Sequence, residues 1–568
     1  MRHALYLRLF ICLPLLIGSS VLLANPSQMV DQEVLASIDK VPPPPKTIND
    51  LVKLLDAAKP DQADIQKSKE ILQAAIPANA TNSQLYVIYR DRARASEHLG
   101  LIKSMLENCQ KEQEYVEPGN RDQFFDAQMS CIQAEFFDGN MQGAINRVNK
   151  ALSSVQARQS NGWQLTFQLL LVNANRQIGD LEAAEAAIRQ VDGIMTILKN
   201  SNAWSEWGSN WTYQSERARG EYYLAAGKPV AAELSFVRGL NAVEKRVEAF
   251  EAGLYKDSTR RVHSRQAVYF NKAIILNRLA NSLFAQRKLT EAEYYYRLAL
   301  KTFLMVGSRN SVAVAGVLNG LSHAVAEQGR IEESLLLSKY ALNSSIESGV
   351  SESSTNMIYS RRSHAAALVN NEKFAEAAQQ FSLIRAAVAK DDFMKDRYKR
   401  LNDLDEVVAL LFSQQASQAE EVVKDMYERS LKSNGPKHSR TGWIQAFYAM
   451  TLEEQGKSKE AKEHFAKAMP VLIDQTRNDA ENQTISLKFQ KRFSILVESY
   501  IGVLFTEAKQ NPQQEKQLIA QAFQLADMAR GSSVQRALTQ STARSTIKDP
   551  VLERLARKEQ DLQRRANS

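Results

Sequence analysis

Between Leu276 and Met469, apolar and small residues recur with a period of about 42 residues. In the clearest copies a small residue in one apolar segment is followed by a Gly or polar turn and then by a second apolar segment that carries Ala, an aromatic residue and Ala. These copies lie at 276–300, 318–342 and 442–469. The period predicts stacked helical hairpins, none of which can bury its apolar face alone.

The anchor residues of the second segments keep this period, in steps of 42 or 43 residues: Ala292, Ser334, Ala377, Ala419 and Ala461. Looser copies precede them, and the earliest, most degenerate unit covers 82–109. The order of small residue, turn, Ala, aromatic and Ala resembles the tetratricopeptide repeat (TPR). The resemblance implies an all-α, right-handed superhelical solenoid of long TPR-like hairpins. HEAT and armadillo repeats have a similar period but lack this order, and they rank second.

The C-terminal segment carries a second resemblance. AFQLADMARGSSVQRALTQSTAR (522–544) and DPVLERLARKEQDLQ (549–563) are similar to the segment that joins TPR arrays to a CHAT domain in bacterial proteins. CHAT domains are caspase-like and lie C-terminal to this spacer. Because the chain ends at Ser568, inside the spacer, we expect no peptidase residue here.

The pattern predicts six segments. We expect a signal peptide at 1–24, a Pro-rich linker at 25–48, degenerate hairpins at 49–272, a regular array at 273–480, capping helices at 481–545, and the start of a coiled-coil spacer helix at 546–568. Arg2 and Arg8 precede a mostly apolar run that is short for the ~20 residues of a bilayer span. This predicts a periplasmic or secreted protein with no membrane span after signal removal. An uncleaved N-terminal anchor is the alternative.

Composition adds few constraints. The net charge of +8 is spread along the chain among acidic residues, which does not favour nucleic-acid binding. The sequence contains no nucleotide-binding fingerprint and no metal-ligand motif, so we expect no cofactor, no metal and no catalytic residue. The stripe of Trp204, Trp207 and Trp211 fits packing between repeats better than a ligand platform.

Cys109 and Cys131 fall on helices expected to pack side by side. In an exported protein two such thiols form a candidate disulfide. Two buried free thiols are the other interpretation, and the sequence leaves both open.

The first helix of each TPR-like hairpin is expected to line the concave side, where residues four apart form columns. These positions give the candidate ligand groove: Arg217, Glu221, Asn277, Asn281, Asn319, His323 and Arg362. Asn can donate to and accept from a peptide backbone, and Arg or His can hold a carboxylate. An ordinary solvated helix face is the competing interpretation.

These features predict an exported, non-catalytic scaffold that binds a partner protein or peptide. The alternative is the sensor half of a caspase-like CHAT peptidase whose catalytic domain is missing or separately encoded, with that peptidase as partner. An envelope assembly factor is a third hypothesis, which rests on fold analogy.

Overall fold

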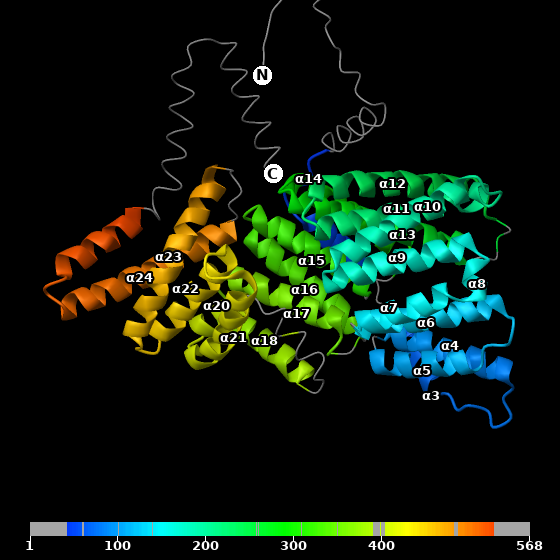
Figure 1. Ribbon diagram of the computed structural model, residues 1–568, viewed down its shortest axis with the longest axis horizontal. Coiled ribbons are helices and arrows are strands. Elements are labelled where there is room, and N and C mark those ends of the chain that lie inside the picture. The colour runs from blue at the N-terminus through cyan, green and yellow to red at the C-terminus, as the bar shows by residue number, and fades with distance from the viewer. Residues whose placement is uncertain are drawn as a thin grey trace, which may run out of the picture. The chain divides into compact units, whose positions relative to one another are not determined.

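A computed structural model describes residues 42–527, with gaps at 59–61, 100, 139, 257, 259–260, 308, 310, 349, 351, 390–397, 399–403 and 482–486. Residues 1–41 lie outside the described residues. The predicted signal peptide, most of the Pro-rich linker, the spacer helix and capping residues from 528 onward lie outside the described residues. All regular secondary structure within the described ranges is helical (Figure 1).

The helices of the N-terminal half follow one another with short turns. They are α2 (Asn49–Ala57), α3 (Gln62–Gln73), α4 (Asn82–His98), α5 (Ile102–Glu114), α6 (Arg121–Asp138), α7 (Met141–Leu152), α8 (Val155–Arg158), α9 (Asn161–Ile178), α10 (Leu181–Lys199), α11 (Trp204–Ala225) and α12 (Pro229–Glu251).

The helices of the C-terminal half continue the same arrangement. They are the short 3-10 helix η1 (Arg261–His263), α13 (Arg265–Ala285), α14 (Leu289–Leu304), α15 (Val312–Glu327), α16 (Ile331–Glu347), α17 (Thr355–Asn370), α18 (Phe374–Val388), α20 (Leu404–Phe412), α21 (Ala416–Asn434), α22 (Ser439–Glu453), α23 (Ser458–Glu481) and α24 (Leu487–Gln510). Residues 515–527 are also helical.

Consecutive helices pair as antiparallel hairpins, which confirms the predicted all-α helical-repeat fold. The pairs α9/α10, α11/α12, α13/α14, α15/α16 and α22/α23 pack closely, and each pair also contacts the next. The anchor residues Ala292, Ala377, Ala419 and Ala461 are all fully buried. This burial explains the period, because every hairpin places the same small residue at a helix crossing.

The close crossings depend on small residues opposite large aromatic rings. A Cβ at Gly220 in α11 would lie 2.4 Å from Phe236 of α12, and one at Gly320 in α15 would lie 2.6 Å from Tyr296 of α14. Both rings are almost fully buried. A larger residue at either glycine would therefore force the two helices apart.

From α9 to α23, each turn within a hairpin uses the left-handed backbone conformation. Gly179, Gly227, Gly329 and Gly456 occupy it where the sequence has glycine, and Arg287, Glu372 and Gln414 occupy the same position in the other copies. The following amide closes the turn on the preceding helix, as Lys288 N does on Leu283 O at 3.0 Å. This is the hydrogen bond of a Schellman helix end. Because the turn residue has a positive φ, any residue other than glycine at this position lowers the stability of the turn.

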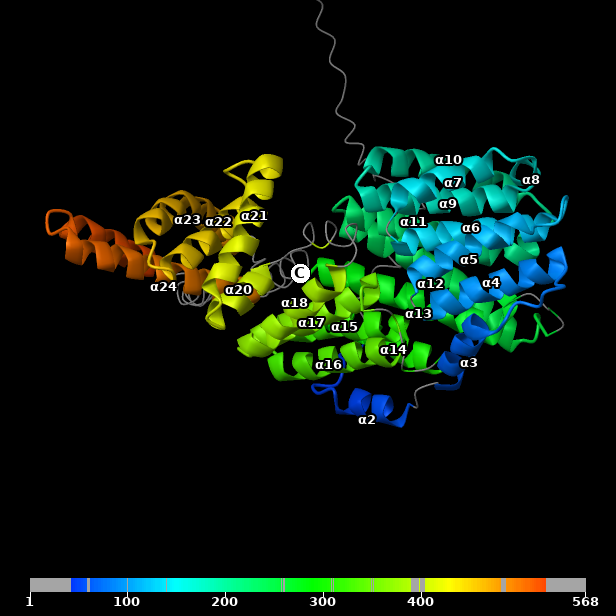
Figure 2. The ribbon, with the colours of Figure 1, turned by 90° about the horizontal axis from the view of Figure 1, so that it is seen from below.

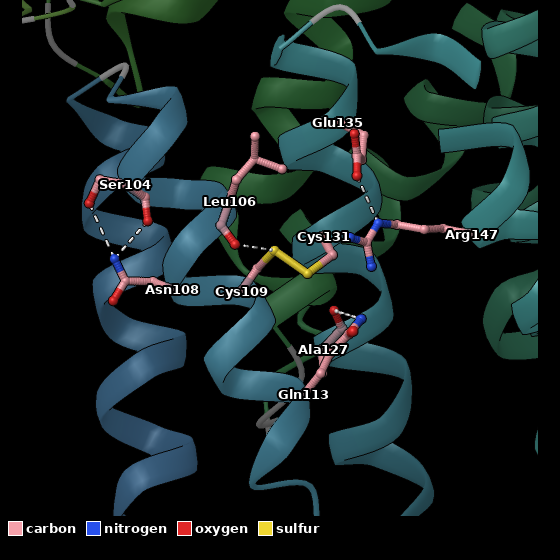
Figure 3. The surroundings of a disulfide bond; sticks show 9 residues. All are labelled: Ser104, Leu106, Asn108, Cys109, Gln113, Ala127, Cys131, Glu135 and Arg147. Atoms are coloured by element: carbon pink, nitrogen blue, oxygen red, sulfur yellow. Dashed lines mark hydrogen bonds and ion pairs between the residues drawn. A yellow bond between two sulfur atoms is a disulfide. The ribbon is translucent and has the colours of Figure 1, made fainter. Parts of the chain in front are cut away.

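A disulfide joins two consecutive hairpins of the N-terminal half, α4/α5 and α6/α7. Cys109 on α5 and Cys131 on α6 are bonded, with their Cα atoms 5.2 Å apart, and both are fully buried (Figure 3). Ala93 and Met105 pack around the bond. Of the two interpretations that the sequence left open, the structure contains the bonded pair.

Glu112, one turn after Cys109, is a buried carboxyl group. Burial raises its pKa to about 7, and neither carboxylate oxygen has a hydrogen-bond partner among the described residues. Between about pH 4.3 and pH 7, Glu112 is therefore protonated in the folded protein, whereas the same carboxyl group is ionised in the unfolded chain, where its pKa is about 4.3. The stability contributed by this proton is fully present below about pH 4 and is lost as the pH rises towards 7.

We expect the α5–α6 pair to be less stable at pH 8 than at pH 5, by an amount on the order of 3 kcal/mol. Hydrogen exchange of α5 and α6, corrected for the intrinsic pH dependence of amide exchange, measures this difference. Glu112→Gln should remove the difference, whereas Glu114→Gln, at an exposed ion pair with Lys111, should keep it. Equal protection of the wild-type helices at both pH values would refute the buried-carboxyl assignment.

Candidate protein-binding face

The first helices of successive hairpins contact one another directly. Contacts link α9 to α11, α11 to α13, α13 to α15 and α15 to α17. We call the solvent-facing side of these helices the first-helix face. Because neighbouring first helices lie side by side, polar residues on consecutive helices can act on one ligand.

A charged cluster joins the first three helices of this face. Glu221 of α11 pairs with Arg278 of α13 at 3.0 Å and with Arg176 of α9 at 3.4 Å. Burial alone would raise the pKa of Glu221, but Arg278, Arg217 and Arg176 outweigh it and lower the pKa. The carboxylate is therefore ionised at neutral pH and shared among three arginines.

Arg217 lies one helical turn before Glu221 on α11. Its Nη1 donates to the Tyr213 hydroxyl at 3.2 Å, and the guanidinium also lies over the Tyr213 ring. Tyr213 and Glu221 together keep the pKa of Arg217 above its usual value, with Tyr213 the larger influence. Three guanidinium groups thus face one carboxylate, which leaves the cluster cationic.

Two predicted asparagines follow on α13. Asn281 Oδ1 accepts a 2.6 Å hydrogen bond from the Tyr296 hydroxyl, so its acceptor is already engaged. Asn277 is half-buried, and its Oδ1 is enclosed with no hydrogen-bond donor among the described residues. An enclosed acceptor without a donor is costly in folding free energy, and a ligand could reach Asn277 Oδ1 only after the surrounding side chains moved.

Asn319 corrects the prediction for α15. We expected it on the exposed column, but its side chain is fully buried and its Nδ2 donates to Ser360 Oγ of α17 at 3.2 Å. Asn319 is buried at this position of the column because α15 packs closely against α17. Asn319 is therefore a core residue that joins two helices.

His323, one turn further along α15, is half-buried. Its Nε2 lies 3.3 Å from Ser363 Oγ, and it lines a cavity of about 90 Å³ together with Asn370, Glu327 and Lys488. Residues of α15, α17 and the start of α24 line this cavity together, although Lys488 is far from His323 in the sequence.

Arg362 and its neighbour Tyr359 continue the face on α17. Arg362 is half-buried, and the Tyr359 side chain is 48% exposed. Partial burial raises the pKa of Tyr359, while Ser363, Arg362 and Arg278 lower it in part. Arg278 and Arg362 are therefore both near enough to this aromatic residue to influence its hydroxyl group.

Several residues of this region were missed by the sequence analysis. Arg176, Arg278 and Tyr359 belong to first helices but were not among the positions that we read: Arg278 follows Asn277 directly, Tyr359 lies three residues before Arg362, and we read no column on α9. Asp405 of α20 is buried and pairs with Lys488 at 2.6 Å and with Arg492. The sequence signal for this pair is Asp405 itself, because a carboxylate within an apolar helix requires a cationic partner.

Another cavity in the described part of the chain lies elsewhere, and several of its polar lining groups are already engaged. It measures about 460 Å³ and is lined by residues such as Met105, Phe137 and Phe270. Ser311 and Ser354, also in the lining, cap α15 and α17, and His98 is hydrogen-bonded to Ser68. The first-helix face is therefore the stronger candidate for partner binding.

The tryptophan stripe packs inside the array, as the sequence favoured. Trp207 lies 6.2 Å from Trp211 between ring centroids, and Trp211 is 8% exposed. Leu165 and Val191 from the preceding hairpin complete the cluster. The stripe therefore stabilises the contact between two hairpins.

Among the residues that the structure describes, no helix is long and apolar enough to cross a membrane, and no group of three or more His, Cys, Asp or Glu side chains could hold a metal ion.

Comparisons with solved structures give only weak similarities. BtubC (BKLC) from P. vanneervenii is 17% identical, with 46% of this chain and 91% of that chain covered and a TM-score of 0.30. The apo form of RapI is 11% identical, with 70% and 98% covered and a TM-score of 0.38. No family model and no curated protein matches the sequence. On the evidence of its own hairpins, the chain is a helical repeat protein.

Proposed function

We propose that this chain is a non-catalytic scaffold that binds a partner protein or peptide along the first-helix face. The observation that carries the proposal is the charge of that face. Four arginines (Arg176, Arg217, Arg278 and Arg362) lie on it around Glu221 and the exposed ring of Tyr359. Guanidinium groups that are already positioned recognise carboxylates at little entropic cost.

The chemistry of the face favours an extended acidic peptide. Arg278 and Arg362 would bind its carboxylates, and the Tyr359 ring would cover an apolar side chain between them. Asn281 supports the face indirectly, since it holds Tyr296 in place.

The proposal includes export from a bacterial cell to the periplasm or beyond. Two features support it: the basic and apolar segment at 1–24, and the buried disulfide between Cys109 and Cys131. Structural disulfides persist in oxidising compartments and are rare in the cytosol.

A second candidate function is regulation of a caspase-like CHAT peptidase. It is favoured by the sequence of 522–563, which is similar to the spacer of TPR–CHAT proteins. In this proposal the peptidase would be the partner, and the first-helix face would receive the signal. Co-purification of a His–Cys peptidase with the chain would favour this function over a general scaffold.

The test of the scaffold function is selection of 12-residue peptides from a random displayed library on the intact chain. We expect enriched peptides to carry Asp or Glu and to bind more weakly in high salt, because exposed charge pairs are screened. Arg278→Glu/Arg362→Glu should reduce their affinity at least tenfold, since reversal replaces attraction with repulsion.

The matched control is Arg189→Glu on α10. Arg189 is an exposed arginine of a second helix and pairs only weakly with Glu185, at 3.6 Å. This variant should bind the selected peptides as well as the wild type does. Peptides that lose affinity equally with both variants would show that general charge attraction, and not this face, accounts for binding.

A further inference from the structure

A short segment near the start of the described chain leaves the hairpin pattern. Residues 45–57, which include α2, contact α14 and α16 instead of pairing with α3 (Figure 2). Our expectation of hairpins from residue 49 onward therefore does not hold for α2. The contacts join residues about 250 positions apart in the sequence, such as Asp50 and Arg297.

The docked segment buries one apolar stripe. Ile48 is 2% exposed, and Leu51 and Leu55 are fully buried. These residues stand at i, i+3 and i+7, the spacing with which an amphipathic helix fills a groove on another protein. The intervening Lys53 faces solvent.

Polar contacts around this stripe fix the register and direction of α2. Arg297 Nη1 donates to Asp50 at 2.7 Å, and its Nη2 donates to the Thr47 carbonyl at 2.9 Å. At the other end, the Tyr340 hydroxyl donates to Asp56 at 2.7 Å, and Arg309 donates to the Leu55 carbonyl at 3.3 Å. Arg309 thus lies at the C-terminal end of α2, where it satisfies one of the last free carbonyls.

The receiving side chains are held in place without α2. Arg297 is braced by Glu293 at 2.7 Å, and Arg309 is braced by Glu347 at 3.2 Å. The groove is therefore preorganised by α14 and α16, the second helices of two hairpins. It is a separate surface from the first-helix face.

The occupant, in contrast, has little stability of its own. A helix of nine residues is too short to persist in water, so α2 orders only when it is docked. Asp50, which makes the ion pair with Arg297, keeps 38% of its side chain exposed. A preformed receptor groove whose occupant is not stable as a helix by itself is the arrangement expected of an exchangeable ligand.

We propose that the groove between α14 and α16 is a second docking site, which α2 occupies in cis and from which a partner helix displaces it. The partner helix carries apolar residues at i, i+3 and i+7 and carboxylates at i+2 and i+8, the pattern of Ile48, Leu51, Leu55, Asp50 and Asp56. Displacement would release residues 45–57 from the array and so report that the partner is bound.

The test uses the intact chain with α2 disabled. Leu51→Asp/Leu55→Asp places carboxylates in the apolar groove and should release α2. A fluorescent peptide with the sequence of residues 45–58 is then titrated, and its anisotropy is measured. We expect saturable binding to this variant that is at least tenfold tighter than binding to the wild type, whose groove is occupied.

Two controls use the same readout. Lys53→Asp adds a carboxylate on the solvent side of α2, so it should leave the groove closed and bind the peptide no better than the wild type. A peptide with Asn at the positions of Asp50 and Asp56 should bind the opened variant at least fivefold more weakly, because it loses both carboxylate contacts.

Two results would overturn the proposal of a second docking site. If hydrogen exchange shows α2 released and the hairpins intact, yet the peptide does not bind, the groove is not a docking site in trans. If the wild type forms a concentration-dependent dimer that the peptide dissociates, the occupant is α2 of a second copy, and the assignment to a different partner is wrong. Loss of peptide binding here leaves the peptide selection on the first-helix face unaffected, so the two proposals fail separately.

Discussion

Replacing Glu293 with Gln is expected to lower the free energy of unfolding by about 3–5 kcal/mol. Glu293 on α14 is fully buried and pairs with Arg297 at 2.7 Å and with Arg330 at 2.8 Å. Gln328 Nε2 donates to the same carboxylate at 2.9 Å. The amide would leave two guanidinium groups in the array without their buried counter-charge.

Chemical denaturation of Glu293→Gln and the wild type measures this loss. Glu185→Gln is the control, because it breaks an exposed pair on α10 in which both side chains are more than half exposed. Such pairs contribute about 0–1 kcal/mol, so the control should unfold almost as the wild type does. A loss below about 1 kcal/mol for Glu293→Gln would show that water or rearranged side chains compensate both arginines.

Replacing Asp405 with Asn is expected to detach the start of α24 and to destabilise the C-terminal hairpins by ~3 kcal/mol. Asp405 is 3% exposed and pairs with Lys488 and Arg492 of α24. Burial acts to raise the pKa of Asp405, but Arg492 and Lys488 prevail and lower it to about 2. Because the unfolded value is about 3.9, this contribution is present above pH 4 and is lost as the pH falls towards 2.

Hydrogen exchange of residues 487–495 at pH 7 measures the detachment. We expect faster exchange there in Asp405→Asn and unchanged exchange in Asp425→Asn. Asp425 makes a partly exposed pair with Arg429 one turn away on α21, so it provides a control within the same hairpin. Unchanged protection at α24 in Asp405→Asn would show that apolar contacts alone hold this helix.

The hairpins were predictable because their signal is local and repeated. A small residue, a turn and an anchor residue recur with a fixed period, so one recognised copy locates the others. The turns at Arg287, Glu372 and Gln414 were harder to place, because the left-handed conformation is occupied there by residues other than glycine. Neighbouring copies with glycine at the same position supply the missing signal.

The candidate site was predictable only in part. Counting four residues along a first helix finds Arg217, Glu221 and Asn277, but it cannot tell how closely the next helix packs. That packing buried Asn319 and exposed Tyr359.

Contacts between distant segments carry no periodic signal. The docking of α2 on α14 and the pairing of Asp405 with Lys488 connect residues about 250 and 83 positions apart. For each contact, the sequence shows a charged residue within an apolar helix, which requires a partner of opposite charge, but it does not show which distant residue that partner is.

The most direct test of the first-helix face is photo-crosslinking in the organism that encodes the chain. Tyr359 on α17 is replaced by p-benzoylphenylalanine, and Leu383, which is 41% exposed on α18, receives the same replacement as the control. We predict a discrete adduct with one partner from position 359, lost when Arg278→Glu/Arg362→Glu is combined with it, and no such adduct from position 383. Adducts from position 383 alone, or an adduct at 359 that survives the charge reversal, would contradict partner binding on this face.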